Sequence, residues 1–182
     1  AVFISGRGSN LKSLIKYSQS KYSKININLI ITNNFNAKGI KYAKKSNIKY
    51  YIIDYKNKKL AEKKIFSKLK IFNVKLICLA GFMKILSKVF IQKFKGKILN
   101  IHPSLLPKYK GLNTHKRVIE NRDQYSGSTV HLVNSKLDSG RIIIQKKVKV
   151  AKTDNVRKLE KKILKIEHKI YPKAIAKLLT NF

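Results

Sequence analysis

Short apolar runs alternate with amphipathic stretches along the first hundred residues of the chain. The apolar runs predict strands at 2–4, 28–32, 50–53, 75–79 and 97–101. Apolar residues at helical spacing between these runs predict helices at 11–18, 38–46, 58–72 and 87–94. Strands that alternate with helices are typical of βαβ units, in which helices cover both faces of a parallel sheet.

The second part of the chain has a different pattern. Residues 102–111 hold two of the three prolines, which predicts an ordered loop, and a short helix is predicted at 114–121. Two strands at 129–133 and 142–150 are expected to pair antiparallel. The last helix is predicted at 156–179, with Asp154 as its cap and with a bend or a new segment at Pro172. The fold class that follows is α/β, a doubly wound, mostly parallel, Rossmann-like sheet with antiparallel C-terminal strands. Ligands bind such sheets at the carboxyl ends of the strands.

The length of 182 residues predicts one domain spanning 1–182. Its N-terminal half, 1–99, would hold the βαβ units, and 100–182 would hold the proline-rich loop, the extra strands and the last helix. No apolar run approaches the ~20 residues of a membrane-spanning helix, and no secretory leader is visible. The single cysteine, Cys78, excludes an internal disulfide and predicts a reducing, cytoplasmic location.

The chain carries 42 basic and 8 acidic residues, a formal net charge of +34. Such a charge suggests nucleic-acid binding, but the basic residues are 37 lysines and only 5 arginines, spread over the whole chain. A strongly AT-rich genome would produce the same bias toward lysine. We therefore expect no specific nucleic-acid partner and no membrane partner. Either origin gives a positive field that favours an anionic substrate.

Small residues follow the first predicted strand, at Gly6, Gly8, Ser9 and Asn10. They let the backbone approach an anion at the N-terminus of the next helix, where free N–H groups and the helix dipole favour phosphate. A tight strand-to-helix turn would need the same residues. The segment fits neither the dinucleotide fingerprint, because position 11 is Leu, nor a Walker A loop.

Polar residues at the end of the fifth predicted strand form the second candidate site. Asn100 and His102 lie two positions apart, so an extended backbone places both side chains on one face. An amide donor and an imidazole can together hold an oxyanion, although a structural histidine in a capped loop is the alternative. Asp138, in a turn before the last strand, is a third candidate. The other histidines have no partners at metal-ligand spacing, so no metal is expected, and Cys78 is expected to be inert core.

Several segments taken together resemble the phosphoribosylglycinamide formyltransferases, a family of folate-dependent enzymes. They are ISGRGSNL (4–11), LAGFMKIL (79–86), LNIHPSLLPKYKG (99–111), THKRVIENRDQYSGSTVH (114–131), LDSGRIIIQ (137–145) and IEHKIYP (166–172). They follow the family order and spacing and cover most of the chain. The NIHPSLLP segment marks the wider formyltransferase superfamily, and the other segments narrow the resemblance to this family.

The resemblance implies transfer of a formyl group from 10-formyltetrahydrofolate, the co-substrate, to the amine of phosphoribosylglycinamide in purine (IMP) biosynthesis. The amine attacks the formyl carbon, and a tetrahedral intermediate collapses to release tetrahydrofolate. By the same resemblance Asn100 and protonated His102 stabilise the oxyanion. Asp138 pairs with His102, raises its pKa and relays protons. The expected partners are these small molecules, and the chain would act as a monomer or homodimer.

The resemblance also assigns the binding residues. Those for the ribonucleotide substrate are Gly8, Ser9, Asn10 and Glu167. Those for the folate are Lys58, Met83, Lys84, Ile85, Leu86, Asn100, Asn134, Leu137 and Asp138. Some positions depart from the family. Arginines are replaced by Lys58 and Lys84, which cannot make bidentate contacts with a carboxylate. Lys110 replaces a proline, and Ser139 replaces a glycine, which matters if that position needs a positive φ.

Three other functions share part of this pattern. A methionyl-tRNA formyltransferase has a similar loop and would suit a basic surface, but it needs a second domain for which 182 residues leave no room. A formyltetrahydrofolate hydrolase normally has an additional regulatory domain. A non-catalytic nucleic-acid-binding domain would concentrate its basic residues on one element, whereas the lysines here are dispersed. Catalytic turnover separates the enzymes from the binding domain.

Overall fold

The computed structural model describes residues 1–180 and confirms the predicted fold class. Its strands are β1 (Val2–Ile4), β2 (Ile30–Thr32), β3 (Tyr50–Ile52), β4 (Leu76–Leu79), β5 (Lys97–His102), β6 (Tyr125–Leu132) and β7 (Ile142–Lys149). Its helices are α1 (Ser9–Ser18), α2 (Ile40–Lys45), α3 (Lys58–Ile71), α4 (Lys88–Lys93), α5 (Thr114–Glu120) and α6 (Val156–Thr180). The strand order is β3-β2-β1-β4-β5-β6-β7, with the crossovers of a doubly wound sheet.

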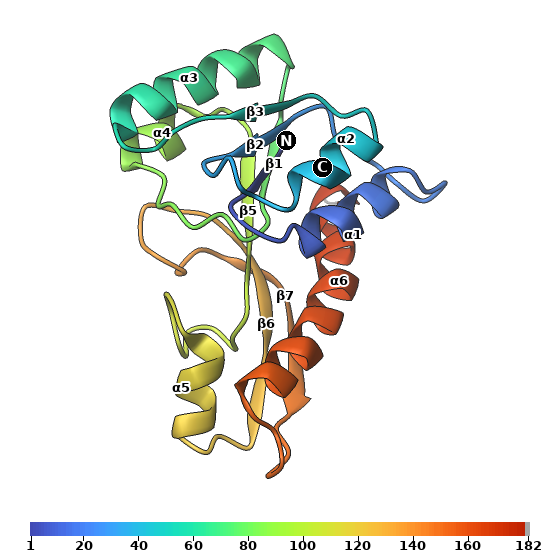
Figure 1. Ribbon diagram of the computed structural model, residues 1–182, viewed down its shortest axis with the longest axis vertical. Helices are drawn as coiled ribbons and strands as arrows, with labels where there is room; N and C mark the ends of the chain where they lie inside the picture. Colours follow the sequence, from blue (N-terminus) through green and yellow to red (C-terminus); the bar gives the residue numbers. More distant parts are fainter. Residues whose placement is uncertain (181–182) are drawn as a thin grey trace. The chain divides into compact units, whose positions relative to one another are not determined.

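The chain divides into two compact units, and the first comprises residues 1–99. Its strands β3, β2, β1 and β4 pair parallel, so that Phe3 lies opposite Ile31 on β2 and Leu79 on β4. The helices of this unit lie on both sides of these strands, α1 and α2 on one side and α3 and α4 on the other (Figure 1). β1 and β2 are wholly buried, as expected for parallel strands that helices cover on both faces.

The second unit begins at Asn100 and is organised around the antiparallel pair β6 and β7, as predicted. Helix α6 packs along both strands, as Figure 1 shows, and also contacts α5. Val118 of α5 forms a buried cluster with Leu159 and Ile163 of α6, and the ring of Tyr109 packs against it. This cluster fixes α5, and with it the end of the loop that follows β5.

Two details of the last helix differ from the prediction. The cap of α6 is Asn155, whose Oδ1 accepts a hydrogen bond from Lys158 N at 2.9 Å. Asp154 instead accepts from Ala151 N and pairs with the ammonium of Lys162. The helix also continues through Pro172, so of the two outcomes predicted there, a bend or a new segment, the new segment does not occur. A proline inside a helix costs ~3 kcal/mol, and α6 buries apolar side chains on both sides of it, which offsets this cost.

Strand β6 begins at Tyr125, four residues earlier than predicted. The first part of the strand is small and polar, so it lacks the alternation that indicates a strand. Small residues are nevertheless required: a Cβ on Gly127 would lie 2.3 Å from the carbonyl oxygen of Lys146 and 2.4 Å from Cδ2 of Leu105. The close approach of β7 and the proline-rich loop therefore explains the composition of this strand.

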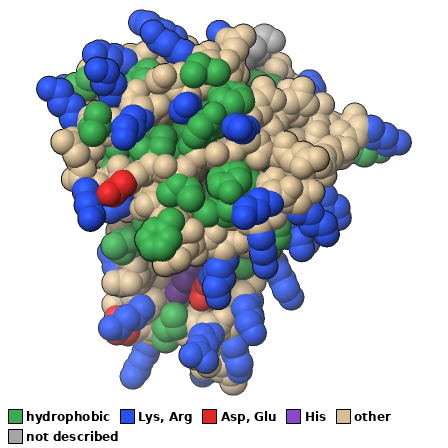
Figure 2. Space-filling view, turned by 45° about the horizontal axis from the view of Figure 1, so that its top comes forward, with side chains coloured by type: hydrophobic (Ala, Val, Ile, Leu, Met, Phe, Trp, Pro, Cys, Tyr) green, Lys and Arg blue, Asp and Glu red, His purple; other side chains and the backbone are tan. Residues whose placement is uncertain are grey.

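Lysine and arginine side chains are scattered over the face seen in Figure 2 and interspersed with hydrophobic side chains. Their spread agrees with the even distribution of lysine along the sequence. Within residues 1–180, no helix combines the length and the apolar character that crossing a membrane requires.

Candidate active site

The structure brings Asn100, His102 and Asp138 together in the second unit. The amide Nδ2 of Asn100 lies 3.4 Å from Oδ1 of Asp138. The ring nitrogen Nδ1 of His102 lies 3.4 Å from the other carboxylate oxygen, Oδ2. The side chains of His102 and Asp138 are each only 7% exposed. An amide, an imidazole and a carboxylate that are this close and this buried can polarise a carbonyl and move a proton between polar atoms.

The loop after β5 is held by hydroxyl groups of β6. Ser128 Oγ donates a hydrogen bond to the carbonyl oxygen of His102 at 3.0 Å, and Thr129 Oγ1 donates to that of Ser104 at 2.7 Å. Gln145 of β7 donates from Nε2 to Thr129 Oγ1 at 2.9 Å. Backbone groups of the loop are therefore paired although they lie outside the strand ladder. These bonds fix the backbone from which His102 projects.

His131 is a fourth member of the cluster, and it was not among the predicted site residues. Its Nε2 lies 3.2 Å from Asn100 Nδ2 and 3.6 Å from Asp138 Oδ1, and its Nδ1 lies 2.8 Å from the carbonyl oxygen of Leu132. A register shift in the pairing with β7 falls between Val130 and His131, and such bulges redirect side chains. Only an alignment of relatives, or the fold itself, could have singled out this histidine.

Asp138 has a left-handed backbone, with φ 45°. The positive φ therefore belongs to Asp138, and aspartate tolerates this conformation better than most residues. The backbone at position 139 does not require a glycine, so Ser139 fits there. Burial alone would raise the pKa of Asp138. Hydrogen bonds from His131 and from the Gly111 N–H, at 2.9 Å, and the neighbouring imidazoles outweigh burial and hold its pKa below the usual value. The carboxylate of Asp138 is therefore kept ionised although the side chain is buried.

Opposing influences act on the pKa of His102. Burial is the largest influence and lowers the pKa of His102 below its ordinary value of 6.5, and His131 and Arg117 act in the same direction. The Tyr109 carbonyl, 2.8 Å from Nε2, and Asp138 both raise the pKa of His102. The expected effect of Asp138 is confirmed in direction, but burial outweighs it. Burial therefore favours a neutral ring before the reaction begins. The protonated form that the resemblance implies for oxyanion stabilisation stays a prediction.

The glycine-rich segment forms the candidate phosphate site, which lies in the first unit. Gly8 caps α1 with φ 73° and, as a glycine, provides no side-chain cap bond to the first turn. Gly39 packs against Gly8, and its N–H donates to the carbonyl oxygen of Gly6 at 3.0 Å. Ser9 and Asn10 begin α1, the former half-buried and the latter buried. A helix N-terminus without a side-chain cap suits an anion.

The folate residues predicted in the first unit lie at the start of α3 and after β4. Lys58, Met83, Lys84 and Ile85 are exposed, whereas Leu86 is buried. Met83 is 63% exposed, but its backbone is fixed, because its N–H donates to Ser5 Oγ at 2.8 Å. Apolar side chains that are exposed on a fixed backbone can pack against a flat ring.

The remaining predicted residues belong to the second unit. Asn134 and Leu137 are exposed in the turn that leads to Asp138, and Glu167 is buried in α6. Asn134 Oδ1 accepts a hydrogen bond from Lys136 N at 2.9 Å, which shapes this turn. Among residues 1–180, no group of three or more His, Cys, Asp or Glu side chains is arranged to hold a metal ion.

Comparisons with known proteins agree with this geometry. The family model described as formyl transferase matches residues 1–175. The chain is 42% identical to a phosphoribosylglycinamide formyltransferase of Haemophilus influenzae, over 96% of this chain and 84% of that protein. It is also 42% identical to the human trifunctional purine biosynthetic protein adenosine-3, but it spans only 18% of that relative's length.

Solved structures show the same likeness. The crystal structure of a phosphoribosylglycinamide formyltransferase from Brucella melitensis superposes with a TM-score of 0.92 at 37% identity, covering 97% of this chain and 93% of that one. Sequence and structure therefore agree over nearly the whole chain. The chain belongs to the formyl transferase family and, within it, to the phosphoribosylglycinamide formyltransferases.

Proposed function

We propose that this protein transfers the formyl group of 10-formyltetrahydrofolate to the amine of phosphoribosylglycinamide, giving formylglycinamide ribonucleotide in purine biosynthesis. The observation that carries the proposal is the buried cluster of Asn100, His102 and Asp138 in a chain of this family. The other two predicted catalytic residues, Asn100 and His102, lie within hydrogen-bonding or ion-pair distance of Asp138. The donor and acceptor are both anionic molecules, which suits a protein of net charge +34.

The reaction requires the protein to move protons and to stabilise a negatively charged oxygen. The attacking amine must lose a proton while the departing folate nitrogen gains one, and the formyl oxygen becomes negative between these events. Neutral His102 can accept a proton, and the carboxylate of Asp138, 3.4 Å away, stabilises the imidazolium that results. The amide of Asn100 donates to the developing oxyanion, the role in which fixed donors contribute most. The nucleophile is the substrate's own amine, so no covalent enzyme intermediate is required.

The phosphate of the ribonucleotide is assigned to the N-terminus of α1, at Gly8, Ser9 and Asn10. The Ser9→Asp protein should therefore bind this substrate less well, with KM raised at least about tenfold, because two negative charges would meet. Its stability should not fall, since an acidic residue is favourable in the first turn of a helix. Steady-state kinetics with both substrates and a thermal melt measure these effects.

The matched control for this charge change is Ser9→Asn, which has a similar size and no charge. We expect its KM for the ribonucleotide to stay within about threefold of wild type. The KM for the folate should be unchanged in both proteins. Equal losses for both substrates in Ser9→Asp would assign the glycine-rich segment a structural role only.

The turn with Asn134 and Leu137, the exposed residues Lys58, Met83, Lys84 and Ile85, and buried Leu86 are proposed to contact the folate. Glu167 is proposed to serve the ribonucleotide. These residues include no metal-ligand set, and the proposal invokes only small-molecule partners. The cytoplasmic location, the single-domain organisation over 1–182 and a monomeric or homodimeric state stay predictions.

The direct test is formyl transfer by the purified protein, followed by the absorbance change as 10-formyltetrahydrofolate becomes tetrahydrofolate. We expect turnover with phosphoribosylglycinamide that falls ~10²–10³-fold in Asp138→Asn. Asparagine has the same shape and also tolerates the left-handed backbone, so a circular dichroism spectrum should be unchanged. A folded wild-type protein that transfers no formyl group to this amine, or transfers it only to another acceptor, would overturn the proposal.

A further inference from the structure

We infer that Tyr109 is a positioning residue for His102: its side chain, fixed to Asp123, aims the backbone carbonyl that holds the histidine ring. The inference rests on the proposed function only in that His102 is the group whose position matters to the reaction. Tyr109 contacts His102 through its backbone carbonyl and Asp123 through its side chain. Its carbonyl oxygen lies 2.8 Å from His102 Nε2, and its phenol hydroxyl donates to Asp123 Oδ2 at 2.8 Å.

The backbone of Tyr109 needs such a support. Its φ is 56°, in the left-handed region that residues with a bulky side chain rarely adopt. A conformation of this kind persists only where surrounding contacts impose it, and it is found most often at functional sites. The carbonyl that faces His102 belongs to this same residue, so whatever holds the conformation also holds the histidine.

The supporting contacts come from α5 and the turn that follows it. Asn121 Nδ2 donates to the hydroxyl of Tyr109 at 2.8 Å, and the guanidinium of Arg117 lies over the ring, 4.9 Å from its centroid. Arg117 Nη1 also donates to the carbonyl oxygen of Lys110 at 2.8 Å. Contacts from α5 and the turn after it therefore hold both Tyr109 and Lys110. The carbonyl oxygen of Tyr109 faces His102.

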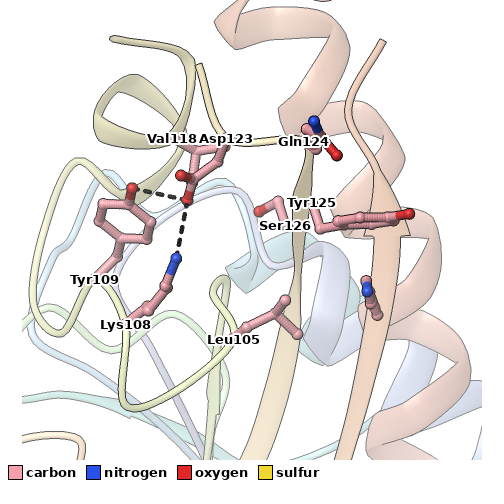
Figure 3. Close-up of a pocket in the computed structure, with 9 residues that line it drawn as sticks. Leu105, Lys108, Tyr109, Val118, Asp123, Gln124, Tyr125 and Ser126 are labelled. Atoms are coloured by element: carbon pink, nitrogen blue, oxygen red, sulfur yellow. Dashed lines mark hydrogen bonds and ion pairs between the residues drawn. The ribbon is translucent and has the colours of Figure 1, made fainter. Parts of the chain in front are cut away.

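A cavity of about 240 Å³ lies beside this contact (Figure 3). Tyr109, Asp123 and Lys108 line it together with Tyr125 and other residues. The ring of Tyr109 packs against the buried cluster of α5 and α6. Its hydroxyl is held at the cavity by the bond to Asp123, which Lys108 also approaches with Nζ at 3.8 Å.

The groups around His102 determine how its pKa would change if the contact with the Tyr109 carbonyl weakened. Asp138 favours the imidazolium form, and His131 and Arg117 oppose it. The imidazole of His115 is also electrostatically coupled to His102. The Tyr109 carbonyl favours protonation, because it accepts a hydrogen bond from the ring. When this bond weakens and burial stays the same, the pKa of His102 falls further.

The test is Tyr109→Phe, which keeps the ring and removes only the hydroxyl. The imidazole nitrogens are followed by ¹⁵N NMR between pH 4 and 9, with the His102 signals assigned by their absence in His102→Gln. We expect the midpoint of His102 to move to lower pH in Tyr109→Phe. The matched control is Tyr125→Phe, since Tyr125 lines the same cavity but its carbonyl does not face His102; its midpoint should equal that of wild type.

Kinetics supply the second readout. In Tyr109→Phe we expect kcat for formyl transfer to fall roughly three- to tenfold, the effect of about one hydrogen bond, with both KM values unchanged. Asp123→Ala should lower kcat in the same way. The effects of the two substitutions should not add in the double variant, because both remove the bond between Tyr109 and Asp123. An unchanged His102 midpoint in Tyr109→Phe would overturn the inference. The NMR result does not need turnover, so it decides this inference even if the proposed function fails.

Discussion

Formyl transfer by the His102→Ala protein is expected to fall by ~10²–10³-fold or more in kcat/KM, the loss typical for one essential polar group. The variant loses both the proton acceptor and the cation that would pair with Asp138. The fold should survive, because Asp138 keeps its hydrogen bond from Gly111 N and its contacts with Asn100 and His131. Steady-state kinetics and circular dichroism on the same samples measure the two quantities.

The pH dependence of kcat/KM tests the same role of His102. The pKa of His102 lies below 6.5 because the ring is buried, so the neutral, proton-accepting form dominates above that value. In wild type, kcat/KM should fall as the pH drops through the pKa of His102 and should reach its plateau at higher pH. This acidic limb should be missing from the residual activity of His102→Ala. The same limb in both proteins would assign it to another group.

His115→Ala is the control for this variant. It also removes a partly buried histidine from the second unit, one whose pKa burial likewise lowers. Its Nδ1 has no hydrogen-bond partner within residues 1–180, and it is no member of the cluster. We expect activity within about threefold of wild type. A loss as large as that of His102→Ala would show that general disturbance of this unit, and not the cluster, limits the reaction.

The second large effect is expected from Gly8→Ala. A Cβ at this position would lie 2.5 Å from the Cα of Gly39, and the backbone has φ 73°. Both the left-handed conformation and the clash with a backbone atom oppose a side chain, so the free energy of unfolding should fall by roughly 3 kcal/mol. Denaturant unfolding measures this change. The displaced helix start should also raise the KM for the ribonucleotide.

Gly6→Ala separates the geometry of Gly8 from the general effect of losing a glycine. A Cβ on Gly6 would meet nothing within 4 Å, and its φ is not positive. We expect the free energy of unfolding to change by no more than about 0.5 kcal/mol. Equal destabilisation by the two substitutions would contradict the close contact between Gly8 and Gly39.

The local pattern of apolar residues was sufficient to predict the bounds of helices and strands that bury an ordinary apolar face. The predicted boundaries of β1 are those observed. The helix α3 differs from the prediction by one residue at its C-terminus, and α4 by one residue at each end. These segments combine helical spacing or short apolar runs with clear turns between them. β6 shows the opposite case, because its first residues lack apolar alternation. Gly127 admits Leu105 and Lys146 at close range. Ser128 and Thr129 bond to backbone carbonyls of the neighbouring segment.

The candidate site was predictable to the extent that adjacent residues or family motifs define it. Asn100 and His102 follow from an extended backbone that ends in a proline-rich loop. Their contact with Asp138 came from the family resemblance, since 36 positions separate His102 from Asp138 in the sequence. His131 was missed because a histidine in an apolar strand has no distinguishing local pattern, and a register shift decides where it points.

The sequence by itself determined the α/β class, the antiparallel C-terminal strands, the family and the identities of the polar groups available for catalysis. Only the tertiary structure decided their electrostatic state. Burial of His102 outweighs the opposite influence of Asp138 on its pKa, and the contacts of Tyr109 fix the carbonyl that faces the ring. The reason is physical: hydration, dipole direction and charge separation depend on distances between segments that are remote in sequence.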